Sequence, residues 1–132
     1  MDRTVRLLIV DDNPRARCAL KVLMSQQEGI YVTAEASNGQ EALRCIKEQT
    51  PDIVLMDMRM PVMNGLEATR NIKANWPQVK VVILTMYPDC QTEAVTAGAD
   101  ALLAKGCPLE ELLSMVTGVK TTYKDDKATR KE

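Results

Sequence analysis

The sequence predicts an α/β fold in which one parallel sheet is covered by helices on both faces. Short apolar runs alternate with amphipathic segments five times along the chain. Parallel strands need right-handed crossover connections, which are usually helical, so this rhythm indicates a parallel sheet. The run at residues 53–56 is apolar without interruption, which is typical of a central strand buried on both faces.

Each predicted strand is a short apolar run bounded by polar or turn residues. Each predicted helix begins at an Asn or Asp that can cap it, or at a Pro that suits its first turn. The strands are expected at residues 5–10, 30–36, 53–57, 80–84 and 101–104. The helices are expected to begin in turn at Asn13-Pro14, Asn38, Asn64, Asp89 and Pro108.

Glycine and proline give the expected ends of three of these helices. Gly29 should stop the first and Gly98 the fourth, because glycine readily adopts the left-handed conformation at a helix end. The third should end near Trp76, since a residue before proline avoids helical geometry. The second and third helices also carry Glu three residues after their Asn caps, as in a capping box with Asn in place of Ser or Thr.

Length and composition limit the possible classes of protein. With 132 residues, the chain is expected to form one domain at residues 4–118, followed by a charged linker or disordered tail at residues 119–132. Its net charge of −1 gives no general attraction to a nucleic acid backbone, so no direct nucleic acid contact is expected. The longest apolar runs are far shorter than the ~20 residues of a membrane span, and no secretion signal is evident, so we expect a cytoplasmic location.

The four cysteines do not suggest a disulfide framework or a zinc site. Their spacing includes no C-x-x-C pair, and the chain has no histidine. Ordinary reduced thiols are therefore expected at Cys18, Cys45, Cys90 and Cys107.

Polar residues follow four of the predicted strands. They are Asp11 and Asp12 after the first strand, Asp57 at the carboxyl end of the third, Thr85 after the fourth and Lys105 after the fifth. Each is an ordinary surface residue when considered singly. All five would nevertheless share the rim at the carboxyl ends of the strands, where open α/β sheets bind ligands.

Three carboxylates would crowd together if the first and third strands are neighbours. Two like charges 4 Å apart cost ~4 kcal/mol at an effective dielectric of 20, so either one carboxyl is protonated or a cation lies among them. An all-oxygen acidic site suits Mg²⁺. Asp57 could then attack a phosphoryl group, with Lys105 and Thr85 contacting its oxygens.

Four stretches carry a resemblance to a known family. They are Leu-Leu-Ile-Val-Asp11-Asp12, Asp57-Met-Arg-Met-Pro61-Val-Met-Asn-Gly65, Leu84-Thr85 and Lys105. Together they resemble the receiver domain of two-component response regulators, over about residues 5–118. The resemblance implies a flavodoxin-like (βα)5 doubly wound sheet with strand order 2-1-3-4-5.

The same resemblance implies a function for the rim residues. Asp57 would be phosphorylated by a sensor histidine kinase, with Thr85 and Lys105 contacting the phosphoryl group. Mg²⁺ would be bound by Asp12, Asp57 and the backbone carbonyl of Arg59, with Asp11 acting through water. The domain would thus be a bacterial phosphoacceptor that promotes its own phosphotransfer and slow autodephosphorylation, rather than an enzyme acting on a separate substrate.

Three further sequence motifs indicate which kind of output domain such a receiver precedes. Leu-Thr-Met-Tyr-Pro-Asp89, Gly98-Ala-Asp-Ala and Pro108-Leu-Glu-Glu-Leu-Leu113 look most like receivers that precede a LuxR-type helix-turn-helix. The resemblance therefore implies transcription regulation through a DNA-binding domain that this chain lacks, with a homodimer as one arrangement of the regulator.

The chain departs from the family pattern at three positions. Leu102 stands where a Tyr or Phe usually swings inward when the threonine engages the phosphoryl group, so Thr85, Leu102 and Tyr87 are the expected switch residues. Gly106 follows Lys105 in place of the usual proline, which excludes a cis Lys-Pro bond and predicts a less firmly held lysine. Met86 is bulkier than the small residue usual there and is expected to hinder the hydrolytic water.

A pseudo-receiver and two alternatives from other classes fit the sequence less well. A pseudo-receiver would serve only as a protein-interaction module, yet all five rim residues are present. A haloacid-dehalogenase-type phosphohydrolase needs a second Asp two positions after its nucleophile, and neither Asp11 nor Asp57 is followed in that way. A flavin carrier needs a phosphate-cradling loop after the first strand, where Asp11 and Asp12 would repel the phosphate.

Overall fold

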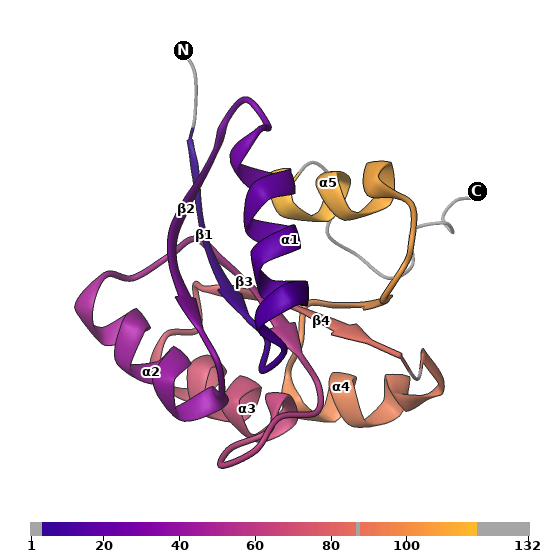
Figure 1. Cartoon of the computed structure of the whole chain (residues 1–132). Helices are drawn as coiled ribbons and strands as arrows, with labels where there is room; N and C mark the ends of the chain where they lie inside the picture. Colours follow the sequence, from indigo (N-terminus) through magenta and orange to yellow (C-terminus); the bar gives the residue numbers. More distant parts are fainter. Residues whose placement is uncertain (1–3, 87, 119–132) are drawn as a thin grey trace, which may run out of the picture.

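The computed structural model describes residues 4–86 and 88–118 (Figure 1). The expected tail at residues 119–132 and the expected switch residue Tyr87 lie outside the described residues. The strands are β1 Val5–Val10, β2 Ile30–Ala36, β3 Ile53–Asp57, β4 Lys80–Thr85 and β5 Ala101–Ala104. The helices are α1 Pro14–Ser25, α2 Gly39–Glu48, α3 Gly65–Asn75, α4 Gln91–Ala97 and α5 Leu109–Thr117, with a 3-10 turn, η1 Pro88–Cys90, before α4.

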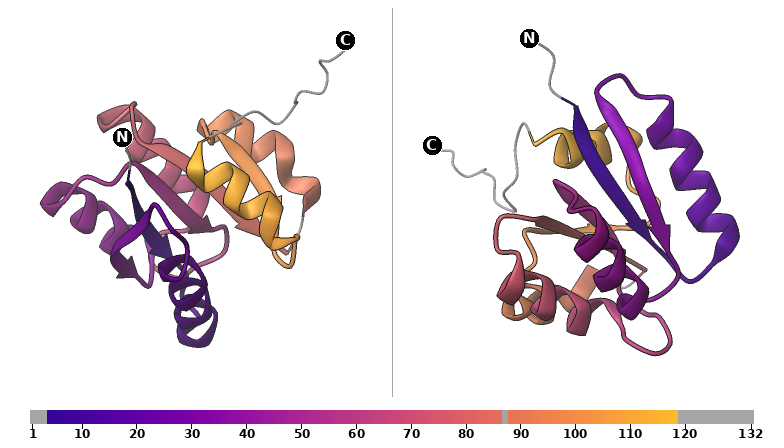
Figure 2. Two further views of the ribbon diagram at one scale, coloured as in Figure 1. Left: turned by 90° about the horizontal axis from the view of Figure 1, so that it is seen from above. Right: turned by 90° about the vertical axis from the view of Figure 1, so that its left-hand side faces the viewer.

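The five strands form one parallel sheet in the order β2-β1-β3-β4-β5, which confirms the predicted flavodoxin-like topology. The two views in Figure 2 show helices on both sides of the twisted sheet. β1 and β3 are direct neighbours, with Val10 paired to Met56. This pairing brings the residues that follow the two strands to the same place on the rim.

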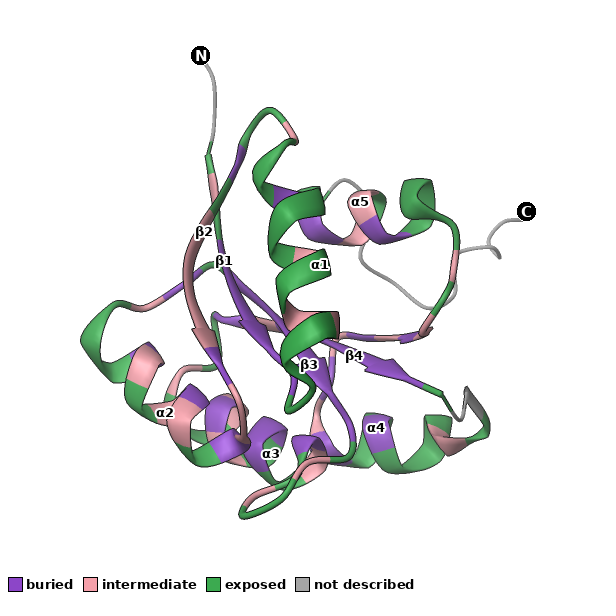
Figure 3. Cartoon of the chain, in the orientation of Figure 1, coloured by how far each residue is buried: buried purple, intermediate pink, exposed green. Residues whose placement is uncertain are grey.

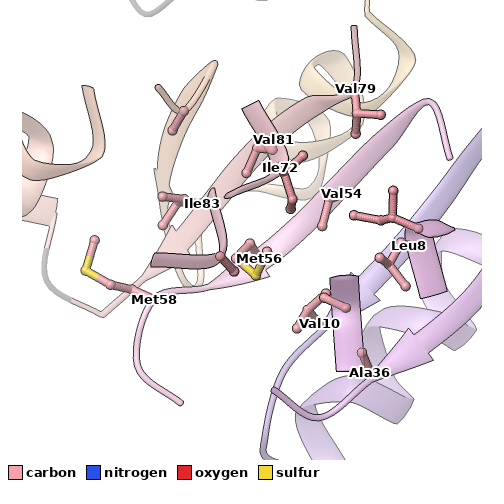
Figure 4. Close-up of a cluster of buried hydrophobic side chains, with 14 of the residues drawn as sticks. Leu8, Val10, Ala36, Val54, Met56, Met58, Ile72, Val79, Val81 and Ile83 are labelled. Carbon is pink, nitrogen blue, oxygen red and sulfur yellow. The ribbon is translucent and has the colours of Figure 1, made fainter. Parts of the chain in front are cut away.

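Alternate residues of the central strands supply two separate cores. Figure 3 shows β3 and β4 as almost wholly buried. On one face, side chains such as Val54 and Met56 pack with α2, α3 and α4, and Figure 4 shows both of them in one cluster with Ile72 of α3. On the other face, Ile53 and Leu55 pack with Met24 of α1 and with α5. A strand with both faces buried explains the unbroken apolar run, because neither face can be polar.

Most of the predicted helix boundaries are confirmed by the caps. The side chains of Asn13, Asn38 and Asn64 accept hydrogen bonds from the first backbone N–H groups of α1, α2 and α3. Gly98 ends α4 with a φ of 95°, and α3 ends at the residue before Trp76. The cap residues thus contribute the free acceptors that these helix starts require.

Three boundary predictions were wrong. The first helix ends at Ser25 rather than at Gly29, because the four-residue helical bonding stops there: the N–H of Gln27 donates to the Met24 carbonyl, only three residues back, at 3.1 Å. Asp89 does not cap the fourth helix: it lies within η1, and α4 follows Cys90 without a side-chain cap. Pro108 directly precedes the fifth helix instead of forming its first residue.

Within the described part of the chain, no helix combines the length and apolar character that crossing a membrane requires.

Candidate phosphoacceptor and metal site

Three carboxylates meet at the carboxyl ends of β1 and β3. One ligand oxygen from each of Asp11, Asp12 and Asp57 lies within 4.8 Å of the others. Asp11 is 2% exposed and Asp57 is 8% exposed, whereas Asp12 lies at the surface. The sheet pairing creates the cluster, because β1 and β3 end side by side. Two of its three carboxylates are therefore largely removed from water.

Lys105 joins the two buried carboxylates. Its Nζ lies 3.2 Å from Asp11 Oδ2 and 3.2 Å from Asp57 Oδ1. The backbone N–H of Lys105 donates to the Thr85 carbonyl at 2.7 Å, which fixes the start of the lysine side chain beside β4. One cation thus bridges two of the three carboxylates that the sequence predicted to crowd together.

The pKa shifts follow from this arrangement. Burial raises the pKa of the Asp57 carboxyl, and the charge of Asp11 raises it further, while Lys105 opposes both effects. Burial by itself would lower the pKa of Lys105, but attraction to Asp57 and the bonds with Asp11 outweigh it, so this pKa lies above its ordinary value. The site accordingly carries more negative than positive groups and favours an additional cation.

The donor set fits a magnesium ion. All three side chains offer carboxylate oxygens, the ligands that Mg²⁺ prefers, and ligands held ~2.1 Å from Mg²⁺ lie about 3 to 4 Å apart in an octahedron. A cluster of oxygens already within 4.8 Å of one another needs only a small contraction to reach that spacing. Arg59 belongs to the loop that begins directly after β3, so its backbone carbonyl lies in the segment adjoining the cluster.

Thr85 is buried at the end of β4, beside the cluster in the sheet order. Its hydroxyl donates to the sulfur of Met58 at 3.8 Å. Sulfur is a weak acceptor, so this hydrogen bond is itself a weak one. Thr85 therefore lies on the predicted rim with its hydroxyl engaged to the residue that follows Asp57.

The loop between β3 and α3 is tightly held. The N–H of Gly65 donates to the Met58 carbonyl at 2.8 Å, and the N–H of Gly39 donates to the Met63 carbonyl at 2.9 Å. A Cβ on Gly65 would collide with the carbonyl oxygen of Asp57. Only glycine therefore allows α3 to begin so close to the phosphoacceptor candidate.

Of the other predicted residues, Leu102 and Met86 belong to the described part of the chain. Leu102 is half-buried, pairs with Ile83 in the sheet, and packs against the core on the α2–α4 face. Met86 is 69% exposed directly after β4. Tyr87, as noted, is outside the described residues, so its expected role in the switch stays a prediction.

Sequence reasoning missed Arg17. Its Nη1 donates to the backbone carbonyl of Asp11 at 2.7 Å, and its Nε is 3.3 Å from Glu35 of β2. A signal was present, because helical side chains point toward the helix N-terminus. Arg17 lies one turn after the Asn13 cap, so its side chain extends back over the start of α1.

Comparisons with known proteins agree with this geometry. The sequence profile of the response regulator receiver domain matches residues 7–117. Response regulator GacA from Pseudomonas aeruginosa is 35% identical over 117 residues, covering 87% of this chain and 55% of GacA. Transcriptional regulatory protein LnrK from Bacillus subtilis is 41% identical over 117 residues, covering 87% of this chain and 53% of LnrK. The chain thus spans about half the length of these relatives.

Solved structures show the same fold. A LuxR-family two-component response regulator from Aurantimonas sp. superposes with a TM-score of 0.84 at 33% identity, covering 95% of this chain and 93% of the other. The response regulator domain of Thermotoga maritima CheB superposes with a TM-score of 0.82 at 29% identity, covering 88% of this chain and 96% of the other. With its parallel sheet, its acidic rim and these relatives, the chain belongs to the response regulator receiver domain family.

Proposed function

We propose that Asp57 accepts a phosphoryl group from a phosphohistidine of a sensor histidine kinase. An Asp57 carboxylate oxygen attacks phosphorus, and the new O–P bond forms as the P–N bond to histidine breaks, leaving the electron pair on the imidazole nitrogen. The observation that carries the proposal is that Asp57 lies close to two other carboxylates and to the Lys105 amine. A nucleophile with a cationic partner and a cation-favouring site suits phosphoryl transfer.

The remaining site residues have distinct roles in this proposal. Lys105 would contact one phosphoryl oxygen, and the Thr85 hydroxyl would exchange Met58 for another. Asp12, Asp57 and the Arg59 backbone carbonyl would hold Mg²⁺ directly, with Asp11 acting through water. When bound, the ion supplies positive charge that offsets the charge developing on the transferred group.

Phosphorylation would switch a transcriptional output in the bacterial cytoplasm. LnrK is named a transcriptional regulatory protein, and the Aurantimonas structure is of the LuxR family. Since this chain spans about half of its curated relatives, we assign DNA contact to a domain outside it, with homodimerisation as one means of readout. Slow autodephosphorylation would end the signal, with Met86 hindering the attacking water.

Mass spectrometry after incubation with acetyl phosphate and Mg²⁺ tests the proposal. We expect a gain of one phosphoryl group, ~80 Da, that is lost with EDTA and with Asp57→Asn. Asp89→Asn is the matched control, because Asp89 is exposed in η1, and it should be phosphorylated like wild type. An unchanged mass in folded wild type would instead leave the pseudo-receiver, an interaction module without phosphotransfer.

A further inference from the structure

Arg17 connects three parts of the fold next to the acidic cluster. It lies in α1, donates from Nη1 to the carbonyl of Asp11 at 2.7 Å, and pairs through Nε with Glu35 at 3.3 Å. Glu35 belongs to β2, where it is paired with Ile9 of β1. The Arg17 side chain is 21% exposed, so most of it is packed rather than free in solvent. The planar guanidinium group of arginine can donate two hydrogen bonds at once in fixed directions.

The bond from Arg17 fixes a particular peptide unit. The carbonyl of Asp11 and the N–H of Asp12 belong to the same planar group, so a donor on that carbonyl limits rotation of the whole plane. Asp11 is also held by its own N–H, which donates to the Ala36 carbonyl at 3.0 Å, and by its Oδ1, which accepts from the Asn13 N–H at 2.9 Å. Arg17 completes the restraints on the backbone that leads into Asp12.

Asp12 depends on that backbone for its position. It is the exposed member of the carboxylate cluster, whereas Asp11 and Asp57 are both buried and bonded to Lys105. The direction of its carboxylate is therefore set largely by the peptide planes on either side. The geometry points to Arg17 as the positioning residue that holds Asp12 ready to bind Mg²⁺, an inference that rests on the proposed function.

The direction in which the Mg²⁺ affinity changes when Arg17 is replaced distinguishes a positioning role from an effect of charge alone. Removing a cation beside an acidic cluster would, through charge alone, strengthen the binding of Mg²⁺. Loss of a positioning contact has the opposite effect, because Mg²⁺ demands near-ideal octahedral geometry. Removing groups that orient metal ligands typically costs 10- to 100-fold in affinity.

The matched control is Lys21. It pairs with the same Glu35 at 3.1 Å, but its side chain is 51% exposed, far more than that of Arg17. Arg17→Met and Lys21→Met therefore remove the same charge from the same partner. Arg17→Lys keeps the positive charge but removes the planar guanidinium group. This variant replaces Arg17→Met in the comparison if the methionine variant does not fold.

The experiment is a titration with MgCl₂, followed by backbone amide NMR shifts at residues 10–13 and 57–59 in wild type and the three variants. We expect the Kd for Mg²⁺ to rise about tenfold or more in Arg17→Met and Arg17→Lys, and to stay within twofold in Lys21→Met. The Mg²⁺ concentration that half-saturates phosphorylation by acetyl phosphate should rise in parallel, with the maximum rate recovered at saturating Mg²⁺.

The possible failures are distinguishable. If wild type shows neither Mg²⁺-dependent shifts nor phosphorylation, the proposed function itself is wrong. If wild type shows both, and the folded Arg17 variants bind Mg²⁺ as tightly as wild type or more tightly, the positioning role of Arg17 is overturned alone. A lower maximum rate with unchanged Mg²⁺ affinity would also overturn it, because that pattern indicates a general structural defect.

Discussion

Replacing Lys105 with methionine tests the electrostatic account of the site. The substitution keeps most of the aliphatic volume and removes the amine that lies 3.2 Å from both Asp11 and Asp57. Removing one partner of a buried ion pair costs about 3–5 kcal/mol, because it leaves a buried charge uncompensated. The Lys105 side chain is 26% exposed, and solvent weakens its pairs, so we expect a loss near the lower limit, ~3 kcal/mol at pH 7 without metal.

The loss should depend on pH in a defined direction. The pKa of Asp57 is already raised in wild type, and removing Lys105 raises it further because the opposing attraction is gone. A group with a raised folded pKa stabilises the fold fully below its unfolded pKa, and this contribution is lost as the pH rises through the folded pKa. The penalty for Lys105→Met should therefore grow as the pH rises from the wild-type pKa of Asp57 to that of the variant.

Urea denaturation in EDTA at pH 5 and pH 7 measures this effect. Lys47→Met is the control, since Lys47 is an exposed lysine in the last turn of α2, and it should change the free energy of unfolding by less than ~0.5 kcal/mol. A penalty for Lys105→Met that is equal at the two pH values, or no larger than the control, would refute the bridging role of this lysine.

Three other substitutions test separate parts of the site. Asp12→Ala should raise the melting temperature in EDTA by removing carboxylate repulsion and should also weaken Mg²⁺ binding; a lower melting temperature with wild-type Mg²⁺ affinity would contradict the cluster. Gly65→Ala should cost ~2–3 kcal/mol in urea denaturation, because its Cβ would collide with the Asp57 carbonyl; wild-type stability would show that the loop yields easily. Leu102→Tyr should spread the NMR shifts induced by beryllofluoride and Mg²⁺ from residues 85–92 to β5 and α5, and identical shift maps for both proteins would exclude a role for the missing aromatic.

The fold was predictable because sequence periodicity reports burial directly. The apolar run at residues 53–56 needs apolar neighbours on both faces, and the five-fold alternation leaves a parallel sheet as its natural arrangement. Helix ends were less predictable, because they depend on where the chain must turn. The loop at Gln26 ends α1 before Gly29 is reached, and η1 takes the place that Asp89 would have needed to cap α4.

The composition of the rim was also predictable, whereas its contacts were not. Because the carboxyl ends of parallel strands share one edge of the sheet, the topology alone predicts that Asp57 and Lys105 lie on the same rim. The bridge from one amine to two carboxylates depends on side-chain conformation, as does the bond between Thr85 and the Met58 sulfur. Arg17 escaped notice because its acceptor is a backbone carbonyl, which no residue type identifies, and only the direction of helical side chains pointed to the contact.

Val62 shows why the loop after Asp57 has a defined shape. Its φ of 69° is unfavourable for a β-branched residue, and the N–H of Met63 donates to the Pro61 carbonyl at 2.7 Å, which forms a tight γ-turn. Such strain persists only where the surroundings fix the backbone. The two glycine N–H bonds, from Gly39 to Met63 and from Gly65 to Met58, provide that restraint on either side of the turn. The segment between them therefore cannot relax independently, and an oxygen ligand drawn from its backbone would be presented to a metal in a fixed direction.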